Sequence, residues 1–193
     1  MTTRPLSVLA RAVPLLAAAV VIPACSDGGT NVQRLTPSQV QGVYNVCTLR
    51  FAPSQGALPT ADILATVVNT TPPAPKQPPS LTLSGQAYQY QLVYTRRSDN
   101  FLQQLNGSVD LGQTNVVTDF PDESQSDIVR ELLLPEALTL TFTDSPRRLT
   151  AASGFTYDVR RSDYARAAGI SETNLADRIN GTLTATFATG ACP

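Results

Sequence analysis

Acidic side chains gather in one segment of this 193-residue sequence and are its first candidates for chemistry. Asp119, Asp122, Glu123 and Asp127 lie close together, and oxygen-rich loops of this kind can bind Ca²⁺. Their spacing matches no EF-hand loop and lacks its central glycine. Hydrolysis of a glycoside would need two carboxylates facing each other across a cleft, which no spacing in the chain specifies. We expect a solvated loop here, with a calcium site as the alternative.

Paired arginines form the second candidate, and two of the three pairs stand where a strand is expected to end. The three pairs are Arg96 and Arg97, Arg147 and Arg148, and Arg160 and Arg161. One interpretation is a single basic rim that binds an anionic ligand or a lipid headgroup through guanidinium forks. The other is a set of charged strand ends that keep sheet edges soluble and pair with nearby aspartates. We favour the second interpretation.

A stripe of aromatic residues is the third candidate. Tyr88, Tyr90, Leu92 and Tyr94 alternate with polar residues and therefore share one face of a strand. These side chains could line a ligand cavity, with the tyrosine hydroxyls offering hydrogen bonds. Core packing is the alternative, and we favour it because tyrosine is common at core edges.

Composition limits what these residues can do. Histidine is absent, which removes Ser–His and Cys–His nucleophile systems and the commonest transition-metal ligand. Tryptophan is also absent. The formal net charge of −1 argues against nucleic-acid binding, which depends on clustered lysines and arginines. We therefore expect a non-enzymatic protein without metal, cofactor or nucleic acid, and a carboxylate-dependent envelope hydrolase is the remaining enzymatic alternative.

The N-terminal 24 residues read as an export signal. Arg4 and Arg11 precede an apolar stretch at 12–22, and a small residue, Ala24, stands before Cys25. Eleven helical residues span about 16 Å, too short for a bilayer core of about 30 Å. A plain signal peptide cut near Ala24, which would leave a free thiol, is one reading of this pattern.

The segment Ile22-Pro23-Ala24-Cys25 resembles the lipobox of bacterial lipoproteins. The resemblance implies cleavage before Cys25, acylation of that cysteine, and anchoring in a membrane of the cell envelope. Ser26 after the acylated cysteine implies the outer membrane, facing the periplasm. Residues 25–38 then form a flexible tether.

Two cysteines remain once Cys25 carries lipid. Cys47 and Cys192 would lie in an oxidising compartment, and we predict that they form a disulfide. The alternative is two reduced, buried thiols. A bond over so long a loop is worth about 4–5 kcal/mol as an upper figure. It would also make the first and last strands neighbours, which favours a closed or nearly closed barrel.

Alternation with a period of two predicts most of the domain at 39–193 as strands. The expected strands are 42–51, 63–68, 81–83, 87–95, 103–111, 114–120, 128–134, 138–143, 147–152, 155–160 and 182–187. Short helices are expected at 162–168 and 171–179, with Gly169 as a stop, and residues 36–40 read as a turn or helical start. The proline-rich segment 70–79 is expected to be a stiff exposed loop, or alternatively a ligand for an aromatic groove on a partner. The fold class is all-β: an antiparallel up-and-down meander of about eight to ten strands closing into a barrel.

Gly42-x-Tyr44, Leu49 and Gly56-x-Leu58-Pro59 resemble the opening strand and turn of bacterial lipocalin-like lipoprotein domains. The resemblance implies a small calycin-type barrel, with Tyr44 where true lipocalins carry tryptophan. We expect a lipid-anchored envelope barrel that binds a small apolar or amphipathic ligand or another envelope component. The alternative is a structural or assembly subunit with a filled core. An interior void of about 300 Å³ or more would favour the ligand, and tight packing would favour the filled core.

Overall fold

A computed structural model describes residues 33–74, 76–85, 88–151 and 155–193. The expected signal segment 1–24, the acylated Cys25 and the tether as far as residue 32 lie outside the described residues. No helix in the described part of the chain has the length and apolar character needed to cross a membrane.

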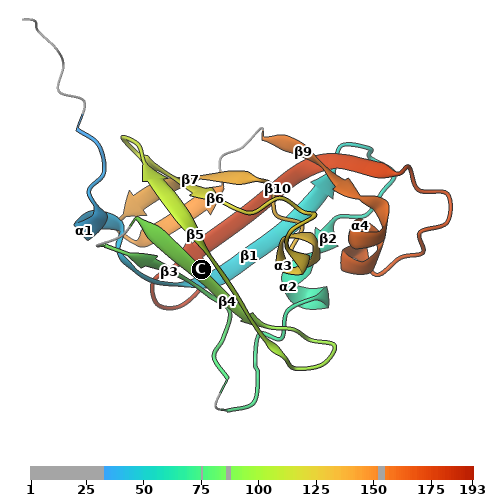
Figure 1. The fold of residues 1–193 in the computed structure, drawn as a ribbon, viewed down its shortest axis with the longest axis horizontal. Coiled ribbons are helices and arrows are strands. Elements are labelled where there is room, and N and C mark those ends of the chain that lie inside the picture. Colours follow the sequence, from blue (N-terminus) through green and yellow to red (C-terminus); the bar gives the residue numbers. More distant parts are fainter. Residues whose placement is uncertain (1–32, 75, 86–87, 152–154) are drawn as a thin grey trace, which may run out of the picture. The chain divides into compact units, whose positions relative to one another are not determined.

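The described chain folds into a closed antiparallel barrel of eight strands, in the order β1-β3-β4-β5-β6-β7-β8-β10, with β10 paired back to β1 (Figure 1). Two further strands extend the sheet, β2 beside β1 and β9 beside β10. The strands are β1 (Gly42–Pro53), β2 (Ala61–Asp62), β3 (Ser80–Ser84), β4 (Gln89–Thr95), β5 (Leu102–Leu111), β6 (Asn115–Asp119), β7 (Ala137–Asp144), β8 (Arg147–Ala151), β9 (Thr156–Arg160) and β10 (Arg178–Ala188). The helices are α1 (Pro37–Val40), α2 (Ile63–Thr66), α3 (Asp127–Glu131) and α4 (Arg161–Ala168). The predicted meander and its closure are confirmed.

Closure depends on the pairing of β1 with β10. The two strands pair from Asn45 opposite Ala188 to Pro53 opposite Gly181, with a register shift next to Cys47. Cys47 on β1 is bonded to Cys192, which lies just beyond the end of β10. Their Cα atoms are 5.3 Å apart. The predicted disulfide and the predicted adjacency of the first and last strands are both confirmed.

The interior is built by the alternation that the sequence shows. On β10, Leu183, Ala185 and Phe187 are buried, and the threonines between them face outward. The same pattern buries Leu138 and Leu140 on β7. One face of each strand therefore supplies the core, because successive side chains point to opposite sides of a sheet.

Three predicted elements are wrong. Within the predicted strand 63–68, residues 63–66 form helix α2, because the Asp62 side chain caps this helix by accepting from the Ala65 N–H at 3.2 Å. Within the predicted strand 128–134, residues 128–131 belong to helix α3, which Ser126 caps in the same way. The predicted helix at 171–179 is a loop followed by the start of β10, because Ile179 pairs with Val159 on β9. The predicted helix at 162–168 is confirmed as α4 and ends at Gly169, whose φ of 67° is left-handed.

The proline-rich segment has no regular secondary structure in its described residues, as predicted. It is nevertheless attached to the β4–β5 turn. The Asn69 side chain donates to Asn100 Oδ1 at 2.9 Å, and the Lys76 amino group donates to the Asn100 carbonyl. Pro79, at the end of the segment, is buried.

Candidate functional site

The aromatic stripe of β4 points into the barrel except at its first residue. Tyr90, Leu92 and Tyr94 are buried, whereas Tyr88 precedes β4, has a φ of 47° and is 52% exposed. The Tyr90 hydroxyl donates to the Asp119 carbonyl at 3.0 Å, and the Tyr94 hydroxyl donates to Glu131 at 2.6 Å. Burial raises the pKa of both tyrosines. Both hydroxyls are therefore engaged by the protein itself.

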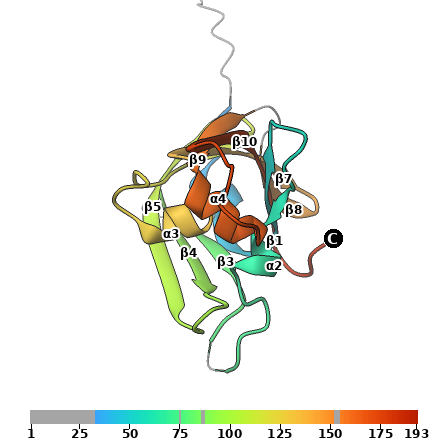
Figure 2. The same ribbon diagram turned by 90° about the vertical axis from the view of Figure 1, so that its right-hand side faces the viewer.

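The segment between β6 and β7, residues 120–136, crosses one end of the barrel, and we call it the capping loop. Its two ends meet where the Phe120 N–H donates to the Glu136 carbonyl at 2.7 Å. The loop contains α3, which lies with α2 and α4 across the end of the barrel that faces the viewer in Figure 2. Leu132 and Leu134 of this loop are buried. The capping loop therefore supplies part of the interior packing.

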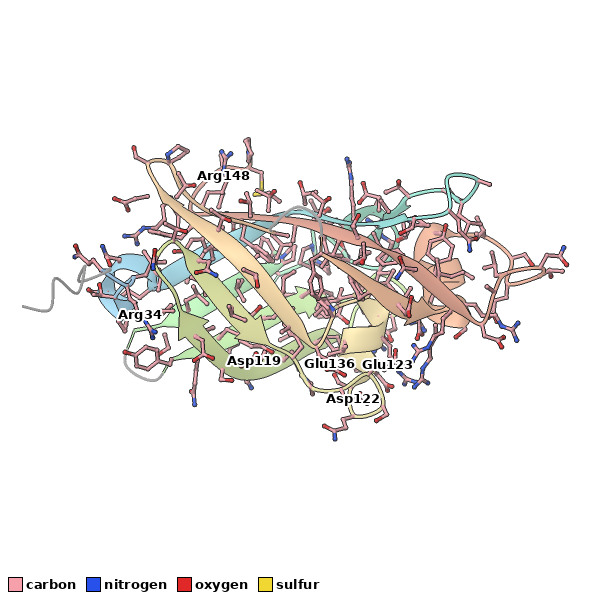
Figure 3. The ribbon with its side chains drawn as sticks, turned by 90° about the horizontal axis from the view of Figure 1, so that it is seen from above. Arg34, Asp119, Asp122, Glu123, Glu136 and Arg148 are labelled. Atoms are coloured by element: carbon pink, nitrogen blue, oxygen red, sulfur yellow. A yellow bond between two sulfur atoms is a disulfide. The ribbon has the colours of Figure 1, made fainter. Side chains whose placement is uncertain are left out.

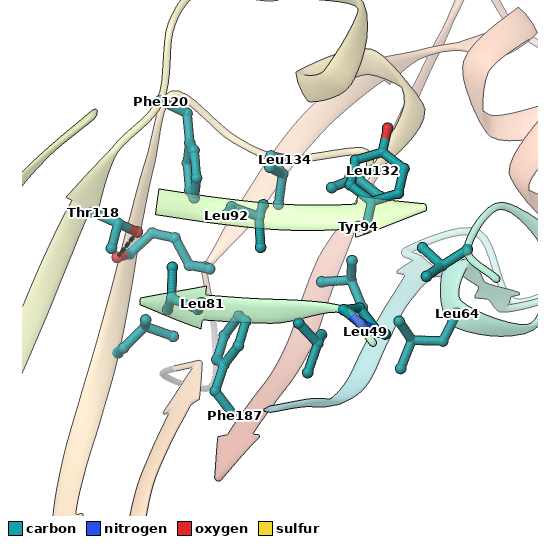
Figure 4. A pocket seen from close by; sticks show the side chains of 15 residues that line it. Leu49, Leu64, Leu81, Leu92, Tyr94, Thr118, Phe120, Leu132, Leu134 and Phe187 are labelled. Carbon is teal, nitrogen blue, oxygen red and sulfur yellow. Dashed lines mark hydrogen bonds between the residues drawn. The ribbon is translucent and has the colours of Figure 1, made fainter. Parts of the chain in front are cut away.

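The barrel interior is almost completely filled. Figure 4 shows Phe120, Leu132 and Leu134 of the capping loop beside Leu92 and Tyr94 of β4. The cavity that remains has a volume of about 20 Å³, enough for no more than one water molecule. Its lining is apolar apart from two hydroxyl groups: Val46, Leu49, Leu64, Val68, Pro79, Leu81, Leu92, Tyr94, Thr118, Phe120, Leu132, Leu134, Leu138, Leu140 and Phe187. This volume is far below the 300–1,000 Å³ typical of small-molecule sites.

Two glutamates attach the capping loop to the strands around it. Glu131 accepts from Arg96 Nε at 3.0 Å and pairs with Arg96 Nη2 at 2.8 Å, in addition to its bond from Tyr94. Glu123 pairs with Arg160 at 3.1 Å and with Arg178 at 2.7 Å. Such charge-assisted hydrogen bonds are stronger than neutral ones and fix the loop over the barrel.

The environment of Glu123 shifts its pKa. Partial burial acts to raise the pKa, but hydrogen bonds from Arg178 and Arg160 outweigh burial and lower the pKa below its ordinary value. The ion pairs consequently persist to mildly acidic pH.

The three arginine pairs do not form one rim. Arg147 donates to the Gln41 carbonyl at 3.1 Å, beside α1. Figure 3 shows Arg148 far from Glu123, to which Arg160 is bound. Arg96 is bound by Glu131 and Asp99, and Arg161 pairs with Asp177 at 3.2 Å. The structure therefore places Arg147 and Arg148 apart from the other two pairs, and it engages Arg96, Arg160 and Arg161 with carboxylates, whereas Arg97 is exposed.

The four acidic residues also have separate partners. Asp127 pairs with Arg130, Asp122 accepts from the Ser124 N–H at 2.7 Å, and Asp119 accepts from Ser108 at 3.2 Å. In the part of the chain that the structure describes, no three Asp, Glu or Cys side chains are placed to hold a metal ion.

A cleft that the sequence did not predict lies between the capping loop and β9, and we call it the β9 cleft. Its volume is about 370 Å³, which falls within the range of binding sites. Its lining is Asp122, Glu123, Val129, Leu134, Pro135, Glu136, Ala137, Phe155, Tyr157 and Asp158. The alternation of Phe155, Tyr157 and Val159 was a signal for β9 itself, but nothing in it indicates that the capping loop lies opposite.

In comparisons with known proteins, no family model, no curated protein and no solved structure matches this chain.

Proposed function

We propose that this chain is a lipid-anchored cell-envelope protein, non-enzymatic, that acts by binding another envelope component through the outside of its barrel. The filled interior carries the proposal. A cavity of about 20 Å³ holds no apolar or amphipathic ligand, whereas a ligand-binding barrel of this type needs about 300 Å³. Binding inside the barrel would require Leu132, Leu134 and Phe120 to leave it.

The attachment of the capping loop adds to this argument. Moving the loop would break the contacts of Glu131 with Arg96 and Tyr94, and those of Glu123 with two arginines. It would also expose buried leucines to water, at about 1.5–3 kcal/mol for each side chain. A purely structural or assembly role shares the filled core, but the β9 cleft favours a protein with a specific partner.

The proposed location in the cell envelope rests on the N-terminal sequence and on the disulfide. Cys25 would carry the lipid, and Ser26 after it favours the outer membrane, facing the periplasm. The Cys47–Cys192 bond supports an exported protein, because disulfides persist mainly in oxidising compartments. The separate roles of the acidic residues support a function without catalysis.

Fractionation of cells that express the full chain tests the anchor. Cys25→Ala should move the protein from the membrane fraction to the soluble fraction, because the acylated residue is lost. Cys192→Ser is the matched control: it removes a cysteine but should leave the protein in the membrane fraction. Membrane retention of Cys25→Ala would contradict the proposed anchor.

Binding of an apolar fluorescent dye tests the filled interior. Anilinonaphthalene sulfonate should gain little fluorescence with the native full chain, because the interior offers it no cavity and the acidic β9 cleft repels its sulfonate group. Saturable binding of one dye molecule per chain, displaced by a fatty acid, would support an interior ligand and contradict the proposal.

A further inference from the structure

One edge of β9 borders the β9 cleft. β9 pairs with β10 through residues 156–160, and the described chain supplies no strand for its other edge. Ala137 from β7 and Tyr157 from β9 both line the cleft.

The hydrogen-bonding pattern shows which groups of β9 face the cleft. The Asn180 carbonyl accepts from the Ser54 N–H at 2.8 Å, on the β1 side of β10. Peptide groups alternate sides along an antiparallel strand, so those of Ile179 and Gly181 face β9. Their partners on β9 are Val159 and Tyr157. The peptide groups of Thr156 and Asp158 therefore point to the opposite edge, toward the cleft.

The side chains of the cleft favour a basic and partly apolar occupant. Val129, Leu134 and Pro135 provide an apolar wall. Phe155 is 46% exposed and stacks on Tyr157 with 5.9 Å between ring centroids, a surface that suits an apolar side chain or a guanidinium group.

Among the described residues that line the cleft, every charged side chain is acidic. Asp122, Glu136 and Asp158 are exposed at its rim, and Glu123 is neutralised by Arg160 and Arg178. Figure 3 shows Glu136, Asp122 and Glu123 gathered at this side of the capping loop.

We propose that the β9 cleft binds a basic, extended segment of a partner protein, which adds to the free edge of β9 as an extra strand. Backbone hydrogen bonds to Thr156 and Asp158 supply affinity, and alternate side chains of the segment supply specificity. One set packs on the exposed ring of Phe155, and the other set pairs with Glu136 and the rim aspartates. The inference rests on the proposed function, because it names the surface through which that binding occurs.

The probe for this inference is a fluorescein-labelled peptide of sequence Lys-Val-Arg-Val-Lys-Val, titrated against the full chain in detergent by fluorescence anisotropy. An extra strand uses only alternate peptide nitrogens of the probe. Methylating one alternate set should therefore weaken binding about tenfold or more, whereas methylating the other set should leave it nearly unchanged. Replacing the basic residues of the peptide by glutamate should abolish binding.

Protein variants locate the site. Phe155→Ser and Glu136→Lys should each weaken binding of the basic peptide about tenfold. Phe101→Ser and Glu172→Lys are the matched controls, because they change an exposed phenylalanine and an exposed glutamate outside the cleft.

Three results would overturn the inference: no binding of the basic peptide, equal effects of the two methylated sets, or control variants as damaging as the cleft variants. None of them would contradict the lipid anchor or the filled interior, because fractionation of Cys25→Ala and dye binding test those two claims separately.

Discussion

Replacing Cys47 and Cys192 together by serine should lower the free energy of unfolding by about 4–5 kcal/mol and leave the barrel folded. The two cysteines are 145 residues apart in sequence, and the loop-entropy relation gives about 5 kcal/mol for a loop of this length. The folded barrel does not need the bond for closure, because β1 and β10 also pair from Asn45 to Pro53. The loss therefore arises mainly from the greater freedom of the unfolded chain.

Urea unfolding of the full chain, followed by circular dichroism, measures this loss. In thermal unfolding, the midpoint should fall by about 8–20 °C, at 2–4 °C per kcal/mol for a domain of this size. The native chain treated with a reductant is the control and should match the double serine variant. A loss below about 1 kcal/mol, or a variant without β-sheet dichroism, would refute the reasoning.

Three further predictions concern the core and the capping loop. Leu140→Ala should lower the free energy of unfolding in urea by about 2–5 kcal/mol, because Leu140 is 0% exposed. Phe101→Ala, at a position that is 66% exposed, should change it by less than about 0.5 kcal/mol. Equal losses would contradict the assigned core. The pKa of Glu123 is lower in the folded state than its ordinary value of 4.5. Its ion pairs therefore stabilise the fold above pH 4.5, and this stability is lost as the pH falls through the lowered pKa. Glu123→Gln should therefore flatten the acid side of a plot of urea midpoint against pH, and an unchanged profile would contradict the assignment. Tyr94→Phe should cost about 1–2 kcal/mol, because it removes the hydrogen bond to Glu131, and a neutral effect would show that this bond contributes nothing.

Much of the barrel could be predicted from the sequence because its signals are local. Period-two alternation places β4, β7 and β10, since each has one buried and one exposed face. Closure could be predicted for a different reason: a cysteine on the first strand and one at the C-terminus can pair only if the chain's ends meet. Both kinds of signal lie in residue type and order.

The wrong elements show where local and tertiary preferences compete. The apolar run at 63–68 is typical of a strand, but Asp62 caps its first turn as a helix, a signal that the sequence did contain. Residues 171–179 favour a helix locally, yet the pairing of Ile179 with Val159 draws their end into β10. Only the pairing partner decides that outcome, and it cannot be read from the segment alone.

The candidate sites were harder to predict than the fold. The tyrosine stripe points inward as its spacing indicates, but the interior is filled by Leu132 and Leu134, which lie about forty residues further along the chain. The β9 cleft depends on the capping loop lying opposite Phe155 and Tyr157. Neither arrangement follows from spacing, because both depend on a long loop folding back over the barrel.

Native mass spectrometry of the full chain, extracted from membranes in mild detergent, tests the central claim most directly. The claim is that this is a lipid-anchored barrel with no ligand inside. The predicted mass is that of residues 25–193 with lipid on Cys25 and no further small molecule retained in the native ion. One apolar molecule retained per chain in the native ion, and released on unfolding, would contradict it.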